Sequence, residues 1–296
     1  MSRYFFLLGI NNSGSTIVSQ YIASSSNGFL PEFGNNEGQD IPEIQEILAT
    51  NTFDWNPSFR VPWGDVKKIY DSYLHDSGKK IFIEKSPPNV IRAAEIAEHF
   101  FDNDKFIGCC LISNPYMFIG SCIKNYIPPW ELNDHVVEQL TKEWIWKVRI
   151  QFSNSQKFDL QIIRYEDFTL DPKKIIEPIL NSFGISIKNS NPTIRGKNRT
   201  GFVSTVMDMT PRHIAFLKQH EIDLINKTLH EDEEILDKVN YSIFNLEDIN
   251  KILSSNLQLS NRGLLERCKY DTRTKPISLR MKVLNELKAL FVNRKF

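Results

Sequence analysis

The chain has 296 residues, of which 41% are hydrophobic and 24% are charged, as in ordinary globular proteins. Its 36 Lys and Arg balance 36 Asp and Glu, and this neutral total argues against the strongly basic surface of a nucleic-acid binder. No apolar run approaches the roughly 18 residues of a membrane span. The four cysteines form no CxxC pair, which predicts reduced thiols and a cytoplasmic location.

Apolar runs alternate with helical patterns through the first 185 residues. The runs predict buried strands at 4–10, 81–83, 106–112 and 160–164. Helices are predicted at about 16–23, 42–49, 64–77, 89–101, 115–124, 133–154, 172–183 and 211–229. Strands that alternate with helices predict a three-layer α/β fold with a central parallel sheet. The loops at 11–16, 84–89 and 113–115 each follow a strand, so they are expected to share the ligand-binding edge of that sheet.

The C-terminal part of the chain differs from the rest in its charge. Residues 261–296 hold ten Lys and Arg and three Asp and Glu, a net charge of +7. The predicted organisation is one domain over 1–245 and a basic helical extension over 246–296, packed on or beside it. One helical face of the extension is apolar, which predicts docking on the acidic remainder of the chain and leaves a weak membrane-surface contact through 277–295 as the alternative.

Gly9 and Gly14, followed by Ser15 and Thr16, have the spacing of a phosphate-binding loop. Glycines let backbone N–H groups converge on phosphate oxygens, and the next helix adds its positive end. Ser15 takes the place of the lysine that binds a nucleoside triphosphate, so a nucleotide-dependent kinase is the weaker reading. A tight turn without a ligand stays open on this motif alone.

Four motifs in order resemble the sulfotransferase superfamily, which uses 3′-phosphoadenosine-5′-phosphosulfate (PAPS). They stand at residues 9–16 (GINNSGST), 84–89 (EKSPPN), 113–121 (SNPYMFIGS) and 164–172 (RYEDFTLDP). The resemblance implies a fold similar to P-loop kinases and transfer of a sulfonate from PAPS to an acceptor hydroxyl, without a metal. Within the fourth motif, Arg164 and Glu166 are expected to form an ion pair.

The resemblance also implies which residues hold the co-substrate. The first loop is expected to bind the 5′-phosphosulfate through Asn12, Ser13, Gly14, Ser15 and Thr16. Lys85 is expected to supply positive charge at the bridging oxygen. The 3′-phosphate positions fall on Ser113 and Ser121, and a basic loop over the nucleotide is expected from Arg195, Lys197 and Arg199.

The stretch from Glu37 to Ile44 (EGQDIPEI) resembles a motif of tyrosylprotein sulfotransferases, in which the leading glutamate is the catalytic base. The acceptor hydroxyl loses its proton as its oxygen attacks sulfur, and a carboxylate within hydrogen-bond reach can take that proton. Glu37 is therefore the predicted base. The alternative reading is a solvated loop carboxylate.

Two positions depart from the family pattern. Asn12 stands where the family has a basic residue beside the sulfonate, and Ser113 stands in place of an arginine that pairs with the 3′-phosphate. Each change removes a charge-assisted hydrogen bond, the stronger kind. A non-catalytic relative that binds the desulfonated product, 3′-phosphoadenosine-5′-phosphate (PAP), is therefore the alternative. The acceptor class and the oligomeric state stay open.

Overall fold

A four-stranded parallel sheet forms the centre of the protein. The computed structural model describes residues 3–48, 53, 55–101, 105–189, 192, 194 and 206–273. Its strands run in the order β2-β1-β3-β4, with all neighbours parallel. Their bounds are Arg3–Gly9 for β1, Ile81–Glu84 for β2, Gly108–Ile112 for β3 and Ile162–Arg164 for β4. The predicted parallel sheet is thus confirmed.

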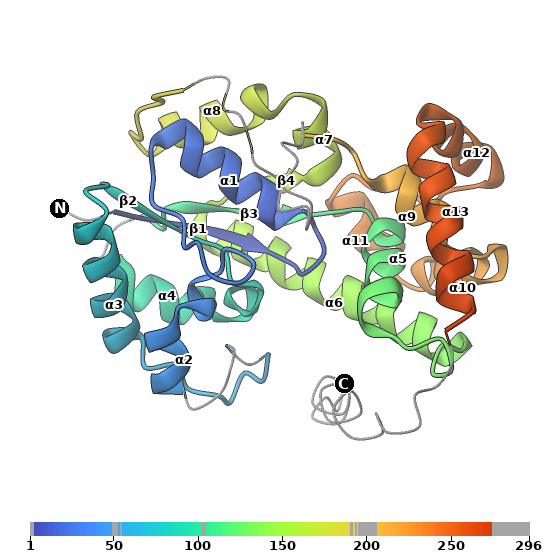
Figure 1. Ribbon diagram of the computed structural model, residues 1–296, viewed down its shortest axis with the longest axis horizontal. Coiled ribbons are helices and arrows are strands. Elements are labelled where there is room, and N and C mark those ends of the chain that lie inside the picture. The colour runs from blue at the N-terminus through green and yellow to red at the C-terminus, as the bar shows by residue number, and fades with distance from the viewer. Residues whose placement is uncertain are drawn as a thin grey trace.

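Helices cover both faces of this sheet and give the predicted three layers (Figure 1). One face packs against α1 (Ser15–Ser26) and α8 (Pro172–Ser182). The other packs against α3 (Trp63–Asp76), α4 (Ala93–Phe100) and α6 (Asp134–Phe158). Because both faces are covered, the strands are continuous apolar runs, and Phe5 to Leu8 are wholly buried.

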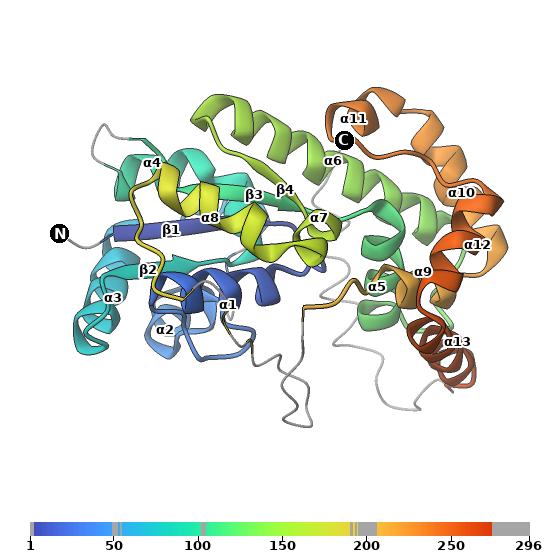
Figure 2. The same ribbon diagram turned by 90° about the horizontal axis from the view of Figure 1, so that it is seen from above.

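Further helices follow the strand ends or connect the layers. Figure 2 shows α5 beyond the end of β3, beside the C-terminal helices. The bounds are Gly38–Asp40 for the 3-10 helix η1, Pro42–Leu48 for α2, Pro87–Arg92 for the 3-10 helix η2, Pro115–Tyr126 for α5 and Tyr165–Leu170 for α7.

The C-terminal helices gather around α5 and the far end of α6. They are α9 (Thr210–Phe216), α10 (Gln219–His230), α11 (Glu233–Lys238), α12 (Leu246–Ser255) and α13 (Leu257–Asp271). The helices α9 and α13 lie so close that a Cβ on Gly263 would overlap the carbonyl oxygen of Arg212. The domain boundary at 245 stays a prediction, and residues 277–295 lie outside the described part of the chain. None of the described helices is long and apolar enough to span a bilayer.

The single helix predicted over 211–229 is wrong, because the chain breaks between α9 and α10. Leu217 and Lys218 have extended backbones, and Lys218 N–H donates to Glu221 Oε2 at 2.8 Å. This contact caps α10 and starts a new helix. The break turns α10 away from α9, so that it packs on α6.

Candidate functional site

A cavity of about 530 Å³ opens at the end of β1 and β2, where the loops that follow these strands lie side by side. The predicted residues Asn12, Gly14, Ser15, Thr16, Glu37 and Lys85 all line it. The opposite wall comes from α5 and α6, with Asn125, Tyr126, Leu140 and Glu143. The topology therefore brings two of the three expected loops to one site, together with the Glu37 segment.

The loop after β1 turns into α1 through a left-handed backbone at Gly14, with φ of 80°. A side chain here would be strained, and its Cβ would overlap the ring of Tyr165. Among the described residues, no side chain caps α1. The first N–H groups of this 12-residue helix are thus available to an anion at the positive end of the helix dipole.

The hydroxyl of Ser13 has a different position from those of Ser15 and Thr16. Ser13 is fully buried and its Oγ donates to the carbonyl oxygen of Ile10 at 2.6 Å. This contact stabilises the turn between Ile10 and Ser13. The geometry therefore supports a role for Ser13 in shaping the loop, while Ser15 and Thr16 lie on the cavity wall.

Asn12 joins the loop to α5. Its backbone is left-handed, with φ of 59°, a conformation that Asn tolerates better than a long basic residue. Its amide donates to Cys122 Sγ at 3.2 Å, and its Oδ1 accepts from Ser121 Oγ at 3.1 Å and from Asn125 Nδ2 at 3.3 Å. Asn12 is thus part of a neutral network, to which the Ser121 hydroxyl also belongs.

Glu37 and Lys85 form a buried ion pair in the cavity wall. Lys85 Nζ lies 3.0 Å from Glu37 Oε1 and 3.0 Å from Thr16 Oγ1, and the two charged side chains are 1% and 8% exposed. Burial lowers the pKa of Lys85, and the Glu37 carboxylate opposes that shift. The arrangement places an ammonium group between a carboxylate and the start of α1.

A second buried carboxyl group fixes the position of the Glu37 segment. Glu84 Oε2 accepts from the N–H of Gly38 at 2.8 Å, and its Oε1 accepts from Asn89 Nδ2 at 2.7 Å. Burial raises the pKa of Glu84, and these hydrogen bonds oppose that shift. Since Glu84 directly precedes Lys85, one strand end positions both members of the ion pair.

Sequence reasoning missed a buried cation behind the loop. Lys147 on α6 is fully buried and donates to Asn11 Oδ1, while its Nζ lies 2.6 Å from Glu143 Oε1 and 4.1 Å from the centre of the Trp55 ring. Glu143 lines the cavity as a second carboxylate. The only signal in the sequence was the i,i+4 spacing of Glu143 and Lys147, which is also common on solvated helix faces.

Ser113 lies away from the cavity. It is fully buried at the end of β3, its carbonyl accepts from Trp144 Nε1 at 2.9 Å, and its hydroxyl has no partner among the described residues. The expected basic residues Arg195, Lys197 and Arg199 lie outside the described part of the chain. The structure therefore places Ser113 away from the predicted site.

The fourth motif supports the edge of the sheet, but the expected Arg164–Glu166 ion pair is wrong. Arg164 pairs instead with Asp167, one turn along α7, with Nε 2.7 Å from Oδ2. Glu166 accepts from the N–H of Asn114 at 2.9 Å and from the Tyr241 hydroxyl at 2.6 Å. It thereby ties the start of α5 to the segment between α11 and α12.

No protein-family model and no curated protein matches the chain. Among solved structures, the sulfotransferase domain from the curacin biosynthetic pathway matches with a TM-score of 0.52 at 17% identity, over 82% of this chain and 99% of that one. The sulfotransferase domain from the Synechococcus PCC 7002 olefin synthase has a TM-score of 0.46 at 16% identity, over 88% and 94% of the two chains. The chain therefore has the fold of a sulfotransferase domain, as its four motifs predicted.

Proposed function

We propose that the protein is a sulfotransferase that moves a sulfonate from PAPS to the hydroxyl group of an acceptor. One observation carries the proposal: an uncapped helix N-terminus, a buried lysine and a buried glutamate meet in one cavity. The helix N-terminus and the lysine can bind the negative charge of a phosphosulfate, and the glutamate can take the proton of an attacking hydroxyl group. The shared fold supports the same reading.

PAPS supplies a sulfonate attached to phosphate, which is a good leaving group. In the proposed site, the N–H groups at the start of α1 and the hydroxyls of Ser15 and Thr16 hold the phosphosulfate. Gly14 keeps the loop open for it, and Asn12 and Ser13 hold the loop in shape. Ser121, Arg195, Lys197 and Arg199 are proposed on the resemblance as the 3′-phosphate side of the nucleotide site.

Glu37 takes the proton of the acceptor hydroxyl as the acceptor oxygen forms its bond to sulfur. The sulfur–oxygen bond to the phosphate breaks at the same time, and its electron pair stays on the phosphate oxygen. Lys85 stabilises that negative charge, since its ammonium group already lies between Glu37 and Thr16. No step in this scheme requires a metal ion, and sulfonate transfer needs no redox partner.

Binding of PAP is the first test. At 100 times its dissociation constant, PAP should stabilise the fold by about 2.7 kcal/mol, measured as a shift in thermal unfolding. Transfer of labelled sulfonate from PAPS to a panel of hydroxyl acceptors then tests catalysis. A protein that binds PAP but transfers to no acceptor would be the non-catalytic relative that Asn12 and Ser113 favour, and Mg²⁺-dependent turnover of ATP would support the kinase reading.

The setting of the reaction is also a proposal. All four cysteines are free, and Cys109, Cys110 and Cys122 are buried, with pKa values that burial raises. Such thiols are inert core residues, consistent with a cytoplasmic protein. The acceptor is proposed only as a molecule with a free hydroxyl group.

A further inference from the structure

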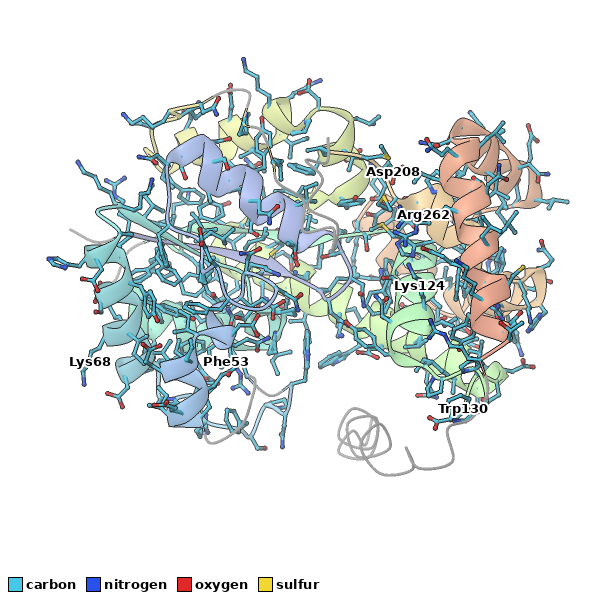
Figure 3. The ribbon with its side chains drawn as sticks, in the orientation of Figure 1. Phe53, Lys68, Lys124, Trp130, Asp208 and Arg262 are labelled. Atoms are coloured by element: carbon cyan, nitrogen blue, oxygen red, sulfur yellow. The ribbon has the colours of Figure 1, made fainter. Side chains whose placement is uncertain are left out.

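Three cations from three helices share a single carboxylate beside the candidate site. Glu266 on α13 lies 2.9 Å from Lys124 Nζ of α5, 2.5 Å from Arg212 Nη2 of α9 and 3.4 Å from Arg262 Nε of α13. These four residues are called the α5 cation cluster below. Figure 3 shows Lys124 and Arg262 close together where α5 meets α13. The cluster carries a net charge of +2.

The positive charge of the cluster is only partly balanced. Burial lowers the pKa of Lys124, the hydrogen bond to Glu266 opposes that shift, and the nearby charges of Arg212 and Arg262 add to it. Burial alone would raise the pKa of Glu266, but its bonds to Arg212 and Lys124 outweigh burial and lower the pKa to about 2. Glu266 therefore stays ionised at neutral pH, and the cations still outnumber it three to one. An anion would stabilise this arrangement.

The cluster adjoins the loop that lines the cavity. Ser121, whose hydroxyl donates to Asn12 of that loop, is one turn before Lys124 on α5. Three residues correspond to roughly 5 Å along a helix axis. Asn125, the next residue after Lys124, contacts Asn12 and lines the cavity. The cations thus lie a short way along α5 from the proposed phosphosulfate site.

We infer that the α5 cation cluster binds the 3′-phosphate of the nucleotide. The inference rests on the proposed function and deepens it. Cations stabilise a 3′-phosphate, and Ser113, which stands in place of the family's arginine, is uncharged and buried away from the cavity. The cluster would add its charge to that of Arg195, Lys197 and Arg199, which are proposed above on the resemblance alone. A guanidinium group binds phosphate oxygens well, and the side chain of Arg262 is 54% exposed. Lys124 adds a second donor at 21% exposure.

The test compares two nucleotides that differ only in the 3′-phosphate, namely PAP and adenosine 5′-monophosphate (AMP). Calorimetry measures the affinity of each for the wild-type chain, Arg262→Gln, Lys124→Gln and the double variant. Each single variant should lower the affinity for PAP about tenfold or more, because the loss of a hydrogen bond between charged groups weakens binding by about that factor. The affinity for AMP should stay unchanged. Lys269→Gln removes the same charge from the exposed side of α13 and should change neither affinity.

The outcomes separate this inference from the function on which it rests. Wild-type affinity for PAP in the double variant would overturn the inference alone, and the proposed function would stand. An equal loss for PAP and AMP would also overturn it, since the effect would then not depend on the 3′-phosphate. A wild-type chain that binds neither nucleotide would overturn the proposed function, and the assignment of this ligand with it. Circular dichroism of every variant checks that the fold is intact.

Discussion

Glu37 is proposed as the base, and its carboxylate is also half of a buried ion pair. Glu37→Gln keeps the shape of the side chain and removes the group that accepts the proton. Turnover should fall about a hundredfold or more, while PAP affinity should stay within about threefold, because the base acts only in the chemical step. Steady-state kinetics and calorimetry measure the two effects. Glu46→Gln, on the exposed side of α2, is the control and should keep full turnover.

Lys85 is expected to stabilise the fold, apart from its role in catalysis. Lys85→Met leaves the Glu37 carboxylate buried without a counter-charge, which should cost about 3–5 kcal/mol of unfolding free energy. The double variant Glu37→Gln with Lys85→Met removes both charges and should recover most of that loss. Urea unfolding of the four proteins gives the coupling energy. Additive losses in the double variant would show that the two residues do not act as a pair.

A substitution at Gly14 tests whether the loop after β1 needs a left-handed backbone at this position. Gly14→Ala forces a side chain into a left-handed conformation and against the Tyr165 ring, so it should destabilise the fold by about 1–2 kcal/mol or more. Gly64→Ala is the matched control, since a Cβ there meets no atom within 4 Å and α3 favours alanine. That variant should be neutral or slightly stabilising. Equal effects of the two substitutions would contradict this account of the loop.

At the scale of elements, the strands were the most predictable part of the chain. Runs such as Phe5 to Leu8 are apolar without interruption because helices cover both faces of the sheet. The break between α9 and α10 could not be predicted, because apolar periodicity continues through Leu217 and the capping residue is Lys218, an unusual N-cap. Tertiary packing, and not local preference, sets that boundary.

The candidate site was predictable where its residues belong to sequence motifs. Glu37 and Lys85 came from motifs, and the structure brings them within 3.0 Å of one another. Lys147 was missed because the sequence does not show which way a side chain on a helix points until the helix has packed. The resemblance gave positions for the 3′-phosphate, but it gave no sign of Lys124 or Arg262. These two residues come together through Glu266 because α5 and α13 both pack on α9.

Glu266 links three helices, and its low pKa makes that link sensitive to acid. Its pKa is about 2 in the folded chain and near 4.5 when unfolded, so its stabilising contribution is complete above pH 4.5 and is lost as the pH falls toward 2. Glu266→Gln lacks this contribution at every pH. The difference in unfolding free energy between wild type and variant should therefore shrink from pH 5.5 to pH 3. A constant difference, measured by urea unfolding against Glu46→Gln as baseline, would contradict the assignment.

For the molecule as a whole, one apolar core extends from the sheet to the last described helix. The same cluster of buried residues contains Phe6 of β1, Trp144 of α6 and Tyr270 of α13. Polar contacts follow the same path, since Tyr270 donates through its hydroxyl to the carbonyl oxygen of Ile127, just after α5. A core that is continuous across residue 245 is expected to unfold as one cooperative unit, whichever way the chain is divided into domains.

Tyr270→Ala tests that expectation. The side chain is 1% exposed and packs edge-on against Phe216, so its loss should cost about 3–5 kcal/mol. If the core is continuous, tryptophan fluorescence, to which Trp63 of α3 and Trp144 of α6 contribute, and far-ultraviolet circular dichroism should shift together to lower denaturant. An independent C-terminal unit would instead give two transitions, with the fluorescence change at its wild-type midpoint. Leu264→Ala on the same helix is the control, because that side chain is 54% exposed and its removal should change stability by less than about 0.5 kcal/mol.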